Sequence, residues 1–175
     1  MHGCLPMACA GPSSLLTIVA RSQDNSPRIS LSCLRMKRIV LASTSPRRKE
    51  LLEQIGLRFD VDPTDFDEDS VSGSDPHEMA KELSLGKARS TAKKHRNAII
   101  IAADTLVVLG DRVIGKPHTN TEAGDMLRAL NGKTHLVITG FTVLDTETVK
   151  VLSRSVETRV CMRRSTLKEI DSYVR

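Results

Sequence analysis

The chain has 175 residues and a formal net charge of +5, with 27% charged and only 2% aromatic side chains. This length suits one domain of ordinary size rather than two. The sequence holds no apolar run of the roughly 18 residues that a membrane-spanning helix needs. The scarcity of aromatic rings argues against the base-stacking surfaces of single-strand binders, and the modest charge fits a small anionic ligand at least as well as a nucleic-acid backbone. We therefore expect neither a membrane nor a nucleic acid as partner.

The first 35 residues differ in composition from the rest, being rich in Ser, Pro and small residues and holding three of the four cysteines. Their longest apolar run, residues 15–20, is too short for a signal-peptide core and follows no basic stretch. We expect residues 1–35 to be an extension that is either disordered or read from an upstream start, with an organelle-targeting segment as the alternative. Residues 36–175 are expected to form a single domain. The cysteine spacing fits neither a zinc site nor a disulfide framework, so reduced thiols and a cytoplasmic location are predicted.

The predicted elements alternate between strands and helices. Apolar runs predict strands over residues 39–42, 58–62 and 98–103, then a hairpin of 106–109 with 112–114 around Gly110-Asp111, and two long strands over 134–145 and 149–162. Helices are predicted over 45–55, 76–92, 119–132 and from 166 onward. The last three begin with capping-box patterns: Asp75 with Glu78, Thr119 with Glu122, and Thr166 with Glu169. This order indicates an α/β domain with a mixed sheet.

The first motif that could carry chemistry is Ser43-Thr44-Ser45-Pro46-Arg47-Arg48, at a predicted strand-to-helix junction. Free backbone N–H groups at a helix N-terminus favour an anion, and two arginines add bidentate donors suited to phosphate. The alternative is an N-cap followed by two solvated arginines.

The second motif is Asp104-Thr105, directly after the apolar run 98–103. Asp104 is therefore expected at the end of a buried strand, where open α/β sheets bind ligands. Such a carboxylate can hold a divalent cation or take a proton from water. A turn aspartate that bonds its own backbone is the alternative.

Two lysines and an acidic loop complete the candidates. Lys116 stands between Gly115 and Pro117 after the hairpin, and Lys87 lies in a helix whose visible face is small and apolar. Each lysine is either a phosphate ligand or a solvated side chain. The acidic loop holds Glu68 and three aspartates and could give one carboxylate to a metal, although such runs are more often solvated loops.

The order of these motifs resembles the Maf family of nucleoside triphosphate pyrophosphatases. The resemblance covers nearly all of residues 38–175 and rests on LASTSPRRKELLEQIG, the acidic loop, Lys87-Ala88, AADTLVV, IGKP, AGDMLRALNGKTHLVITG and SVETRV. It implies a mixed, curved sheet flanked by helices, as in the Maf and inosine-triphosphatase folds. It also implies hydrolysis of a nucleoside triphosphate between its α- and β-phosphates with a divalent cation, Mg²⁺ or Mn²⁺. A homodimer is implied by analogy.

Carried over by position, the resemblance makes Asp104 the catalytic proton acceptor and, with Glu68, a metal-side carboxylate. Substrate binding falls to six residues: Ser45, Arg47, Arg48, Lys87, Thr105 and Lys116. Arg47 and Thr105 match the branch that acts on dTTP and UTP. A non-catalytic nucleotide-binding or division-regulating protein of the same family is the alternative function.

Members of the family continue past the position of Tyr173 into a segment of the form GEP-x-x-KAG-x-YGIQG, whereas this chain ends at Arg175. That segment holds a Gln that helps to define the dTTP/UTP branch and strands that complete the sheet. The resemblance therefore implies a sheet that is incomplete at the C-terminus, with open strand edges.

Overall fold

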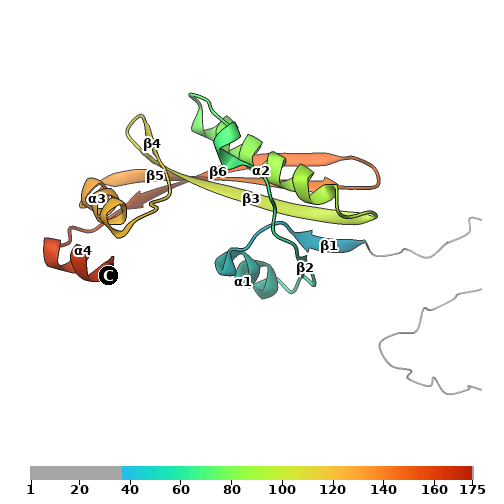
Figure 1. The fold of residues 1–175 in the computed structure, drawn as a ribbon, viewed down its shortest axis with the longest axis horizontal. Coiled ribbons are helices and arrows are strands. Elements are labelled where there is room, and N and C mark those ends of the chain that lie inside the picture. The colour runs from blue at the N-terminus through green and yellow to red at the C-terminus, as the bar shows by residue number, and fades with distance from the viewer. Residues whose placement is uncertain (1–36, 175) are drawn as a thin grey trace, which may run out of the picture. The chain divides into compact units, whose positions relative to one another are not determined.

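A computed structural model describes residues 37–174 of the chain. The predicted extension, residues 1–35, lies outside the described residues. The elements follow the order β1 (Arg38–Leu41), α1 (Pro46–Gln54), β2 (Asp60–Val61), the 3₁₀ turn η1 (Glu68–Ser70), α2 (Pro76–Ala92), β3 (Ala98–Leu109), β4 (Arg112–Ile114), α3 (Asn120–Leu130), β5 (Thr134–Asp145), β6 (Val151–Cys161) and α4 (Leu167–Tyr173). Figure 1 shows their arrangement. No helix within residues 37–174 is long and apolar enough to cross a membrane.

One predicted boundary is wrong, and the error concerns the candidate site. Asp104 was expected at the end of a strand, but β3 runs without a break from Ala98 to Leu109, so Asp104 lies near its middle. Local patterning suggests an end there because a carboxylate interrupts the apolar run. The strand continues because the side chain of Asp104 is buried against a lysine of α2.

The sheet is mixed, as the sequence predicts, with the strand order β2-β1-β3-β5-β6 and with β4 paired to β3. β1 runs parallel to both β2 and β3, whereas β3 pairs antiparallel with β5, and β5 antiparallel with β6. Within β3, residues 98–101 are the ones that pair with β1. The rest of β3 therefore extends past the end of β1, and the chain leaving β1 turns away beside Asp104.

Helix α2 covers one face of β3 and β5 (Figure 1). Its buried side chains recur every three or four residues, which is the spacing of one helix face: Ala80, Leu83, Ser84, Lys87, Ala88 and Thr91. Most of them are small, so the helix lies close to the sheet. The closest approach is at Gly140 of β5, where a Cβ would stand 2.0 Å from the carbonyl oxygen of Ala80. The face that packs into the core therefore also carries Lys87.

We predict that Gly140→Ala destabilises the fold strongly, by at least about 3 kcal/mol, because the added methyl group meets helix backbone that cannot move alone. Urea unfolding of the variant against the parent chain measures this. Gly115→Ala is the matched control, since a Cβ at Gly115 meets no atom within 4 Å. Equal stability of the Gly140→Ala variant and the parent would show that α2 does not pack this closely on β5.

Candidate phosphate and metal site

The loop that leaves β1 forms one wall of the candidate site. Ser43 is buried, and its hydroxyl accepts hydrogen bonds from the backbone N–H of Ser45, at 3.2 Å, and from Nη1 of Arg48, also at 3.2 Å. Ser45 begins α1 as its N-cap residue, but its side chain makes no capping hydrogen bond. The predicted strand-to-helix junction is therefore present. The hydroxyl that orders this loop, however, belongs to Ser43, which lies in the predicted motif but is not among the predicted binding residues.

The two predicted arginines are placed differently. Arg48 is half-buried, and its Nη2 also donates to the hydroxyl of Thr105 at 3.4 Å. Thr105 in turn hydrogen-bonds to Thr139 of β5 at 3.1 Å. Arg47 is exposed and is not among the described residues that line the cavity of the site. The structure thus brings Arg48 and Thr105 together and leaves Arg47 pointing into solvent.

Lys87 and Asp104 form a buried ion pair between α2 and β3. Lys87 is 5% exposed and Asp104 is 2% exposed, and Nζ of the lysine contacts Oδ1 of the carboxylate. The pair follows from the two elements, since Lys87 lies on the buried face of α2 and Asp104 on the face of β3 that this helix covers. Two charges so far from water persist only because they neutralise each other.

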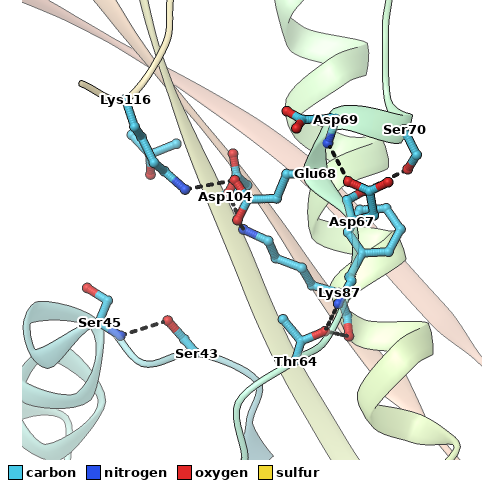
Figure 2. A network of polar contacts seen from close by, with 12 residues as sticks. Ser43, Ser45, Thr64, Asp67, Glu68, Asp69, Ser70, Lys87, Asp104 and Lys116 are labelled. Atoms are coloured by element: carbon cyan, nitrogen blue, oxygen red, sulfur yellow. Dashed lines mark hydrogen bonds and ion pairs between the residues drawn. The ribbon is translucent and has the colours of Figure 1, made fainter. Parts of the chain in front are cut away.

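Glu68 joins this pair to Lys116. Its Oε1 lies 2.9 Å from Nζ of Lys87, and its Oε2 lies 2.7 Å from Nζ of Lys116. Figure 2 shows these side chains converging from the 3₁₀ turn, α2 and the segment after β4. Partial burial of Glu68 opposes its ionisation, but the hydrogen bonds and charges of Lys116 and Lys87 outweigh this and hold its pKa below the ordinary value. Cations and carboxylates therefore alternate through four residues that lie far apart in the sequence.

Lys87, Glu68 and Lys116 line a cavity of about 300 Å³ together with Arg48. Its lining consists of Ala42, Ser43, Thr44, Ser45, Arg48, Thr64, Glu68, Lys87 and Lys116. A hollow of this size, with two lysines and an arginine, suits the phosphate chain of a small ligand. In the described part of the chain no cluster of three or more His, Cys, Asp or Glu forms a metal site of its own. The carboxylates of Glu68 and Asp104 both contact Lys87, so they lie close enough to serve one ion together.

Two aspartates of the acidic loop make contacts outside the cavity. Asp65 makes an exposed ion pair with Lys94. Asp67 accepts the N–H of Asp69 and caps the 3₁₀ turn that carries Glu68. Only one carboxylate of the acidic loop therefore enters the cavity.

The fold and the cavity define an α/β protein with a basic cavity beside two carboxylates. The same fold occurs in a HAM1 protein from Coxiella burnetii, with a TM-score of 0.51, 20% identity, and coverage of 74% of this chain and 75% of that one. It also occurs in the Ham1 protein of Staphylococcus aureus, with a TM-score of 0.52, 15% identity and coverage of 71% of each chain. This likeness confirms the predicted fold class, a mixed sheet flanked by helices.

Comparison of sequences assigns the chain to a family. Residues 38–175 match the Maf family, described as Maf-like protein, so the chain belongs to that family. A protein of Methanosarcina mazei named dTTP/UTP pyrophosphatase is 45% identical over 141 residues, which are 80% of this chain and 72% of that protein. A protein of the same name from Pelotomaculum thermopropionicum is 44% identical over 139 residues, or 79% of this chain and 73% of that protein. The predicted family is confirmed.

We predict that Lys87→Met destabilises the fold by about 3–5 kcal/mol, because it leaves Asp104 buried without the cation that contacts it. The double variant Lys87→Met/Asp104→Asn should recover a large part of this loss, since it buries no charge at either position. Urea unfolding at neutral pH measures the free energy of unfolding of the parent chain, the single variant and the double variant. Lys94→Met is the control, because it removes an exposed ion pair and should change stability by less than about 1 kcal/mol. No recovery in the double variant would mean that the pair does not carry this energy.

Proposed function

We propose that the chain is a nucleoside triphosphate pyrophosphatase that hydrolyses dTTP and UTP to the monophosphate and pyrophosphate with a divalent metal ion. The observation that carries this is the convergence of three cations, Arg48, Lys87 and Lys116, on one cavity that Glu68 also lines. The buried carboxylate of Asp104 contacts Lys87 beside this cavity. The names of the relatives from M. mazei and P. thermopropionicum support the substrate class.

The charges of the site favour a metal-bound triphosphate over a bare one. The three cations of the site are largely balanced by its two carboxylates, which leaves too little positive charge for about four negative charges on a triphosphate. Mg²⁺ is commonly held by one or two carboxylates together with substrate phosphates. Glu68 and Asp104 fit this donor set and would hold the ion. When bound, it supplies positive charge to the phosphates as they reorganise.

The protein side chains then have separate tasks. Lys116 and Arg48 bind phosphate oxygens from two sides of the cavity, and the buried hydroxyl of Ser43 fixes the guanidinium of Arg48. Lys87 holds the carboxylate of Asp104 in place through their buried ion pair. Asp104 orients a water molecule towards the α-phosphate and accepts its proton. The water oxygen bonds to the α-phosphorus while the bond to the bridging oxygen of the β-phosphate breaks, and pyrophosphate leaves.

The substrate-binding roles of three residues remain predictions. Arg47 would have to turn in from solvent to contact a phosphate, Ser45 would act through its uncapped hydroxyl, and Thr105 would contribute beside Arg48. The homodimer implied by analogy also stays a prediction.

We predict that Asp104→Asn lowers kcat by about 100-fold or more while the chain still folds and binds nucleotide. Folding should persist because Lys87 keeps Glu68 as its partner. Pyrophosphate release is measured with dTTP, UTP, ATP and GTP, each with Mg²⁺ or Mn²⁺, and nucleotide binding is measured separately by calorimetry.

Turnover of dTTP and UTP above ATP and GTP by the parent chain supports the proposal. Binding without pyrophosphate release by the parent chain would instead favour the non-catalytic reading. Full activity of the Asp104→Asn variant would remove Asp104 from the mechanism.

A further inference from the structure

The loop that carries Glu68 reaches the site without being part of the sheet. It leaves β2 after Val61 and enters the 3₁₀ turn at Glu68. The ion pairs of Glu68 with Lys87 and Lys116 lie at its far end, and Glu68 itself is only half-buried. A packing contact holds this loop against α2 near Lys87.

Phe66 provides that contact. A Cβ placed on Gly86 of α2 would lie 2.3, 2.4 and 2.8 Å from three carbons of the Phe66 ring. The ring therefore rests directly on the helix at a position where any larger residue would displace it. Gly86 immediately precedes Lys87, and Phe66 stands two residues before Glu68. The contact thus joins the loop to the helix close to Lys87 and Glu68, which form an ion pair.

A hydroxyl supports the same attachment. Thr64 accepts the N–H of Phe66 at 3.2 Å and donates to the carbonyl oxygen of Lys87 at 3.5 Å (Figure 2). Beyond Phe66, Asp67 caps the 3₁₀ turn and accepts the Ser70 hydroxyl on its carbonyl oxygen at 2.6 Å. The loop is therefore attached to α2 through residues 64 and 66, and just beyond the helix through the contacts of Asp62 with His95 and of Asp65 with Lys94.

We propose that Phe66 is a positioning residue: its packing on Gly86 sets the place of the Glu68 carboxylate between Lys87 and Lys116. This rests on the proposed function for its effect on turnover. Phe66 touches no reacting atom in this role and acts only through Glu68. The absence of a side chain at residue 86 is what allows the loop to dock at this depth.

The decisive variant is Gly86→Ala. Alanine is the better helix former by about 1 kcal/mol in a helix interior, so the substitution itself favours α2. It nevertheless displaces the Phe66 ring and with it Glu68. We expect kcat for dTTP and UTP to fall about 10- to 100-fold, as for other small misplacements of a site group, with no rise in KM because the phosphate-binding lysines remain.

Hydrogen exchange provides a readout that needs no substrate. Amide exchange across residues 62–70 should become faster in Gly86→Ala, while exchange in the core of α2 stays slow. Gly124→Ala is the matched control: it is the same change inside helix α3, where the nearest atoms to the added Cβ belong to the end of the Arg128 side chain, at 3.3 Å and beyond. It should leave both kcat and loop exchange unchanged.

Two further variants test whether the effect passes through Glu68. Phe66→Leu offers a smaller side chain, so Phe66→Leu/Gly86→Ala should be more active than Gly86→Ala alone. In a Glu68→Ala background, Gly86→Ala should no longer change kcat. Slow loop exchange and full activity in Gly86→Ala would overturn the proposal, as would an undiminished effect of Gly86→Ala in the Glu68→Ala background. If the parent chain hydrolyses no nucleotide, the proposed function fails, and the exchange experiment still decides whether Phe66 docks the loop.

Discussion

Lys87 and Asp104 face each other between α2 and β3, and both are almost entirely removed from water. A buried charge without a partner is costly, so the two elements must keep this register for the fold to be stable. The same pairing places the lysine where a second carboxylate, Glu68, can reach it. This one contact lies beside the cavity, at a point where β3 continues without a break, and it meets the acidic loop at Glu68.

The packing of α2 shows how this contact is maintained. The helix lies on the sheet with small residues, and Gly140 lets its backbone approach β5 closely. On another side the same helix lacks a side chain at Gly86, where the Phe66 ring rests. One helix therefore joins the core, the ion pair and the loop of Glu68, and two glycines set how near its neighbours come.

Local patterns in the sequence were sufficient for most of the architecture. The capping box of Thr166 with Glu169 forms as predicted, and Asp75 caps α2, although it does so through the N–H of His77. Local reasoning failed at Asp104, because the rule that a charge ends a buried strand takes no account of a partner 17 residues earlier in the chain. It also selected Ser45 as the binding serine, whereas the hydroxyl that accepts hydrogen bonds from Ser45 and Arg48 belongs to Ser43. The contact of Phe66 with Gly86 joins a loop to a helix, so no periodic pattern in the sequence indicates it.

The alternation of charges around Glu68 has a consequence for how the cavity treats ligands of different charge. Lys87 and Lys116 already have a carboxylate beside them, so an incoming anion must replace an existing attraction. A triphosphate offers several oxygens to these lysines at once and gains much from the exchange. A monophosphate offers fewer and gains less. Under the proposed function, this internal counter-charge would weaken retention of a monophosphate product more than capture of a triphosphate.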